Sequence, residues 1–74
     1  MEVKRYMLKA KIPLSCFRSI DGSVPKVSDV VVFDQGFTFS DGKPGCLVYG
    51  INEAGEYRYE AEVYESELGH DSHS

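Results

Sequence analysis

The sequence predicts a small all-β protein with a single domain, in which about five antiparallel strands curve into a barrel. Short runs of alternating apolar and polar residues recur along the chain, and this period of two is typical of strands with one buried face. Clusters of the turn-forming residues Gly, Pro and Asp separate the runs. The chain has 74 residues, which suffice for one hydrophobic core. A flat sheet of that length would leave too much apolar surface exposed, so we expect the sheet to close into a barrel.

The first predicted strand covers residues 5–12. Its apolar side chains would share one face of an extended chain, and they are Tyr6, Leu8, Ala10 and Ile12. A helix competes with this strand, because helical spacing is also present, at Val3, Tyr6, Met7 and Ala10. No capping residue precedes the segment and Pro13 ends it early, so the sequence favours the strand.

Turn chemistry dominates residues 13–26. Asp21-Gly22 and Pro25 are typical of turns. We expect an irregular segment that runs over the barrel surface and is held there by three isolated apolar side chains, those of Phe17, Ile20 and Val24.

The rest of the chain alternates between predicted strands and turns. The predicted strands are residues 30–33, 37–39, 46–51 and 57–63. The turns between them, at 40–45 and 52–56, contain the glycines that tight connections favour. We expect the barrel to occupy residues 1–68 and residues 69–74 to form a disordered tail.

Nine aromatic residues, four Phe and five Tyr, exceed what the core of so small a domain needs. We expect the core to take Phe33, Tyr57, Tyr59 and one of Phe37 and Phe39. The other aromatic residues flank turns or share a strand face with glutamates, which is typical of a surface that binds proteins. The predicted partner-binding residues are Phe37, Tyr49, Glu60, Glu62 and Tyr64.

Motifs within residues 26–68 resemble those of a known superfamily. Lys26-Val27-Ser28-Asp29-Val30-Val31-Val32 resembles the opening strand of SH3-like barrels, and Gly45-Cys46-Leu47-Val48 is similar to their next strand. The alternating strand that ends in a short acidic turn and Leu68 is similar to their last strand. The segment 13–26 has no counterpart in the minimal barrels. The resemblance implies a barrel fold and leaves the function open, because such barrels bind peptides, nucleic acids and other subunits.

Charge is distributed unevenly along the chain, although the net charge is only -4. Residues 1–28 carry six basic and two acidic residues, a balance of +4, and residues 29–74 carry two basic and ten acidic residues, a balance of -8. One interpretation is structural: the first and last strands pair, so that Lys9 and Lys11 face Glu60 and Glu62. The other is functional: an acidic face receives a basic partner.

These features together predict a binding domain rather than an enzyme. The expected partner is a protein or peptide. A second copy of this chain is one such partner, which would make the domain a homodimer. The alternative is a weak nucleic-acid-binding barrel with a basic N-terminal strand, which would use Tyr6, Lys9, Lys11 and Arg18. The acidic net charge opposes that alternative, because it repels phosphate. We expect no catalytic residue, no cofactor and no metal site.

The sequence also favours a cytoplasmic location. Cys16 and Cys46 are too few for the disulfide framework of a small secreted domain, so we expect free thiols. The N-terminus lacks the apolar stretch of a secretion signal. No run of about 18 apolar residues is present, so we expect no membrane span.

Overall fold

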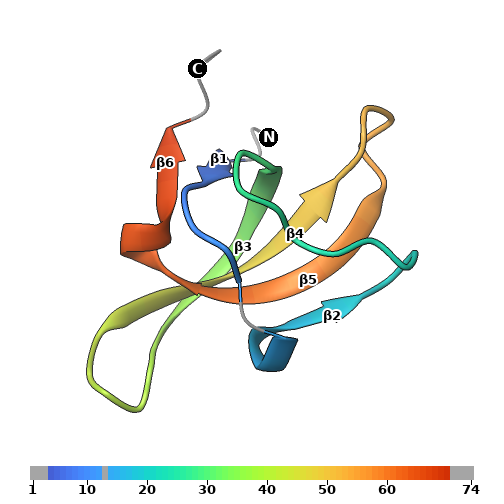
Figure 1. Cartoon of the computed structure of the whole chain (residues 1–74). Coiled ribbons are helices and arrows are strands. Elements are labelled where there is room, and N and C mark those ends of the chain that lie inside the picture. The colour runs from blue at the N-terminus through green and yellow to red at the C-terminus, as the bar shows by residue number, and fades with distance from the viewer. Residues whose placement is uncertain (1–3, 13, 71–74) are drawn as a thin grey trace.

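A computed structural model of the chain describes residues 4–12 and 14–70 (Figure 1). These residues form six strands, β1 (Arg5–Leu8), β2 (Phe17–Ser19), β3 (Val30–Thr38), β4 (Pro44–Ile51), β5 (Tyr57–Tyr64) and β6 (Leu68–His70). They also form two 3₁₀ turns, η1 (Leu14–Cys16) and η2 (Glu65–Glu67). The predicted all-β fold is confirmed, with six strands in the described residues rather than about five. No helix in those residues is long and apolar enough to cross a membrane.

All six strands belong to one antiparallel sheet in the order β2-β5-β4-β3-β1-β6. Two consecutive hairpins join β3, β4 and β5, which are the longest strands. β1 extends this sheet on the β3 side and β2 extends it on the β5 side. The segment that follows β1 passes along the curved sheet (Figure 1), and its residue Ile12 joins the core.

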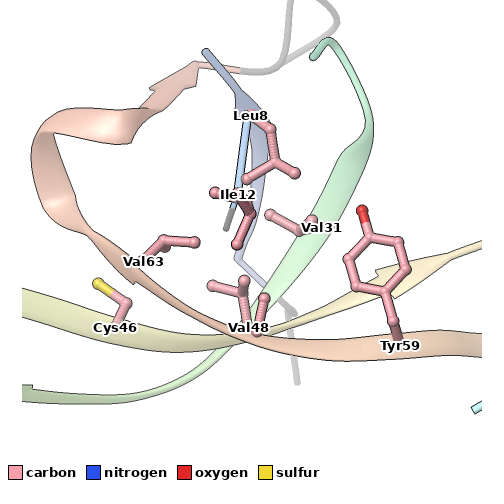
Figure 2. Close-up of a cluster of buried hydrophobic side chains, with 8 residues drawn as sticks. Leu8, Ile12, Val31, Cys46, Val48, Tyr59 and Val63 are labelled. Atoms are coloured by element: carbon pink, nitrogen blue, oxygen red, sulfur yellow. The ribbon is translucent and has the colours of Figure 1, made fainter. Parts of the chain in front are cut away.

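The hydrophobic core lies inside the curve of the sheet (Figure 2), and its members are Leu8, Ile12, Val31, Cys46, Val48, Tyr59, Ala61 and Val63. They come from β1, β3, β4 and β5 and from the segment after β1. Alternate residues of β4 and β5 point inward, as the period of two predicts. The Tyr59 side chain is fully buried, and its hydroxyl donates a hydrogen bond to a carboxylate oxygen of Asp29 at 2.8 Å.

Tyr57 does not lie in the core as predicted, since it is 52% exposed. Gly50 of β4 pairs with Tyr59, and the next residue, Ile51, pairs with Tyr57, so Arg58 is one residue too many for its partner strand. This bulge interrupts the alternation of β5 and turns Tyr57 to the outside. The other predicted core aromatics, Phe33, Phe37 and Phe39, are half-buried, and Phe33 packs against the core from its edge.

Residues 14–26 are more regular than their turn chemistry predicts, because they contain η1 and β2. Phe17 packs against the core, but Ile20 and Val24 are exposed rather than anchoring the segment. Pro25 is the buried residue in this part of the loop.

Two predicted boundaries move. β1 ends at Leu8, although Ile12 remains buried as the alternation predicts. At the other end of the chain, β6 pairs with β1 as far as His70, two residues past the predicted end of the barrel. The rest of the predicted tail, residues 71–74, lies outside the described residues.

Candidate binding face

The five predicted partner-binding residues all lie on the outer side of β3, β4 and β5. The inward residues of β4 and β5 belong to the core, so the residues between them point outward. Strand register then places Tyr49 opposite Glu60, and Leu47 opposite Glu62. Gly45 lies between Phe37 and Tyr64 in the same way. We call this surface the outer face; its members are Phe37, Phe39, Leu47, Tyr49, Tyr57, Glu60, Glu62 and Tyr64.

Three aromatic rings gather at one end of the outer face, beside the β3–β4 hairpin. Phe39 packs against Phe37 at 4.8 Å between ring centroids and against Tyr64 at 4.2 Å. All three rings are half-buried. Gly45 makes this packing feasible, because a Cβ atom at that position would overlap the Phe39 ring.

A carboxylate holds this aromatic group from the hairpin turn. The Tyr64 hydroxyl donates a hydrogen bond to Asp41 at 2.8 Å, and the backbone N–H of Lys43 donates a second one at 3.0 Å. The hydrogen bond from Lys43, followed by that from Tyr64, lowers the pKa of Asp41. The hydrogen bond to Asp41 and partial burial raise the pKa of Tyr64. The Tyr64 ring is therefore fixed in position.

Two stacked tyrosines lie at the other end of the outer face. The rings of Tyr49 and Tyr57 are 4.4 Å apart and within 9° of parallel. The β5 bulge makes this stack, since it turns Tyr57 outward beside its neighbour. Partial burial, and then the negative charges of Asp34 and Glu60, raise the pKa of Tyr49.

Leu47 and two glutamates separate the two aromatic groups. Glu60 forms an ion pair with Arg18 at 3.1 Å, across the β2–β5 ladder. Glu62 is exposed. A shallow groove of about 210 Å³ lies between these residues and η1; its lining residues are Ser15, Cys16, Phe17, Arg18, Leu47, Glu60, Ala61 and Glu62.

The structural interpretation of the charge asymmetry named the wrong basic residues. Lys9 and Lys11 were expected to face Glu60 and Glu62, but β1 pairs with β3 and β6 rather than with β5. The neighbour of β5 on that side is β2, so Arg18 is the residue opposite Glu60. The basic and acidic parts of the chain do meet, through a strand that the sequence did not predict.

The residues of the nucleic-acid alternative lie on β1, on the segment after it and on β2. Tyr6 is half-buried and packs edge-on against Phe33, with 6.4 Å between ring centroids. Lys9 and Lys11 are exposed in the segment that follows β1. Arg18 lies on β2, on the other side of the β3–β4–β5 unit, and is engaged by Glu60. Tyr6 and Arg18 thus each have a partner among the described residues, Phe33 and Glu60 respectively.

Some members of the outer face were missed from the sequence. Leu47 and Phe39 could have been found, since Leu47 alternates with the buried Cys46 and Val48, and Phe39 adjoins the predicted Phe37. Tyr57 could not, because nothing in the local sequence marks the bulge at Arg58.

The two cysteines do not pair with each other. Cys46 belongs to the core, and burial, followed by the charge of Glu65, raises the pKa of its thiol. Cys16 is half-buried at the groove. In the described part of the chain, no three side chains of His, Cys, Asp or Glu come together in a way that could hold a metal ion.

Comparisons of this chain with protein-family models, curated proteins and solved structures find no match. The resemblance to the SH3-like superfamily therefore stays a prediction, and the chemistry of the outer face has to be judged from its own residues.

Proposed function

We propose that this domain binds a protein partner, or a peptide segment of one, on the outer face. One observation carries the proposal: all five residues predicted for this role share one side of three neighbouring strands. Together with Phe39 and Tyr57, they form two aromatic groups separated by two glutamates. Surface of this composition, with aromatic anchors and polar edges, is typical of protein-binding sites.

The outer face is suited to binding because it is largely pre-formed. Hydrogen bonds between strands fix its backbone, and packing between the rings fixes Phe37 and Phe39. A hydrogen bond from its hydroxyl to Asp41 fixes Tyr64. Tyr57 keeps 52% of its surface available for contact. A partner would therefore gain contact area with little loss of side-chain entropy.

Selection from a random peptide library displayed on phage would test this proposal, with the purified domain as bait. Tyr57→Ser and Tyr64→Ala each remove one aromatic anchor, and we expect each to weaken binding of the enriched peptides about tenfold or more. Val27→Ser is the matched control, because Val27 is 56% exposed and lies outside the outer face.

Circular dichroism melting of each variant must accompany the binding measurements, since Tyr64 also packs on Phe39. A selection that enriches no peptide would contradict the proposal. Peptides that bind the two tyrosine variants as tightly as the original domain would contradict it equally.

A further inference from the structure

We infer that the outer face recognises an extended segment in which a lysine or arginine lies two residues away from an apolar residue. This inference rests on the proposed function and specifies its ligand. It requires an available negative charge, a surface for the stem of a basic side chain, and an apolar subsite at the right distance.

Glu62 supplies the available charge. The described residues contain one ion pair, between Arg18 and Glu60, and it leaves Glu62 without a cationic partner among them. Glu62 is exposed and lies between the two aromatic groups. The nearby carboxylates of Asp34 and Asp41 add negative charge along the edges of the outer face, which favours a basic ligand over an acidic one.

The surface beside Glu62 suits the stem of a basic side chain. Leu47 lies directly opposite Glu62 in the β4–β5 ladder, and both line the groove of about 210 Å³. Lysine and arginine lay their methylene groups along apolar surface while the charged end reaches a carboxylate. Arg18 already places a guanidinium beside Glu60 on the same face, with 75% of its side chain exposed.

The aromatic group at the hairpin supplies the apolar subsite. Glu62 and Tyr64 are two residues apart on the same side of β5, a separation of about 6.6 Å along an extended chain. A ligand that is itself extended has the same spacing between alternate side chains. One basic side chain at Glu62 therefore brings the second residue along to the rings of Phe37, Phe39 and Tyr64. The basic residue can come first or last, according to the direction of the ligand.

NMR titration of the ¹⁵N-labelled domain with the peptide Gly-Ser-Arg-Ser-Leu-Ser-Gly and its reverse would test the inference at low salt. For at least one of the two, we expect shift changes at Leu47, Glu62 and Tyr64. Replacing the peptide's arginine by glutamate, or placing arginine and leucine side by side, should weaken binding at least about fivefold.

Charge reversal provides the decisive comparison. Glu62→Lys should abolish binding of the arginine peptide and restore binding of the glutamate peptide. Glu62→Gln, which keeps the size of the side chain, should also weaken binding of the arginine peptide. Glu53→Lys, in the exposed β4–β5 turn, makes the same change of charge elsewhere and should leave binding intact.

The inference and the proposed function fail separately. Absence of binding by both peptides, or binding unaffected by Glu62→Lys, would overturn the inference. Library peptides that depend on Tyr57 and Tyr64 but contain no such basic residue would also overturn it, and the proposed function would stand. If no library peptide depends on those tyrosines, the proposed function fails as well.

Discussion

Gly50 shows how one missing side chain makes room for the centre of the core. It lies opposite Tyr59 in the β4–β5 ladder, and a Cβ atom built on Gly50 would overlap the Tyr59 ring. That ring is fully buried and hydrogen-bonded to Asp29, so it has no free space to move into. Burial, followed by the hydrogen bond to Asp29, raises the pKa of Tyr59, which keeps its hydroxyl protonated as the donor.

Gly50→Ala should therefore destabilise the domain by about 2–3 kcal/mol, the upper range for overpacking a core. Urea denaturation would measure the loss. Gly36→Ala is the matched control in the neighbouring strand, because an added Cβ there meets its nearest atom at 3.8 Å, an ordinary contact. Equal free energies of unfolding for the two variants would contradict this prediction, because they would show that the Tyr59 ring can shift without loss of stability.

The sequence predicted some core residues correctly and others wrongly, and the residues of β5 show why. The predicted core position of Tyr59 is confirmed, and Ala61 and Val63 follow it at alternate positions of the same strand. The same alternation predicted Tyr57 wrongly, because the bulge at Arg58 arises from pairing with β4 rather than from residues nearby. The error matters for function, since Tyr57 then becomes part of the outer face.

The turn of the β3–β4 hairpin helps to position a side chain of the outer face, because Asp41 in the turn is hydrogen-bonded to Tyr64. Its turn is closed by backbone hydrogen bonds between Phe39 and Lys43, and between Gly42 and Phe39. Gly42 adopts a φ of 85°, a left-handed conformation that glycine tolerates. Asp41 then accepts hydrogen bonds from both the turn and Tyr64. The ionised carboxylate is thus the form that the hairpin stabilises.

The hairpin should weaken in acid for this reason. The pKa of Asp41 is lowered in the folded protein, so its contribution is complete above the ordinary value of 3.8 and is lost as the pH falls through the lower folded value. The original domain should be more stable than Asp41→Asn at pH 6, and this difference should shrink towards pH 2.5. Urea denaturation at both pH values would measure it, with Asp34→Asn as the charge-matched control. A difference that stays constant with pH would contradict the role of Asp41.

The sequence predicts those strands whose own residues are typical of strands and whose ends are marked by turn residues. β3, β4 and β5 contain β-branched or alternating residues, and the turns between them contain glycine. β3 joins the predicted strands 30–33 and 37–39 into one, with a register shift between Phe33 and Gln35. β2 has three residues, Phe17–Ser19, inside a stretch with turn composition, and only its pairing with β5 makes it a strand. Because β2 was missed, the basic neighbour of Glu60 could not be identified from the sequence as Arg18.

The whole molecule depends on strands from opposite ends of the chain. β1 pairs with β6, and Leu68 of β6 packs against the core beside Leu8. These contacts form only when the rest of the barrel is in place, so the two terminal strands should unfold together with it.

Removal of residues 68–74 should accordingly destabilise the entire domain rather than fray one edge. We expect a loss of about 2–4 kcal/mol, similar to that of truncating a large core side chain, and a single cooperative transition at lower urea concentration. A chain that ends at His70 retains β6 and serves as the control. If removing β6 left the midpoint unchanged, the pairing of β1 with β6 would contribute nothing to stability.

The part of the outer face on residues 45–49 and 60–64 was predictable, because regular alternation places its side chains on one side of the sheet. Tyr57 was not, because the bulge at Arg58 turns it outward. The groove beside η1 and the pairing of Arg18 with Glu60 were not predictable from alternation, since both are products of tertiary structure. The charge asymmetry of the sequence did not indicate which carboxylate is paired; in the described residues Glu60 forms an ion pair with Arg18.

The pairing of Tyr6 with His70 places the first and last strands side by side, although they lie far apart in the sequence. The two ends of the described barrel are neighbours, so a short linker would join them into a closed ring. Such a ring could be opened at the β4–β5 turn without breaking any strand pair, and the resulting circular permutant would keep the same sheet. In this domain, the pairing of strands in space defines the architecture, and the order of the strands along the chain does not.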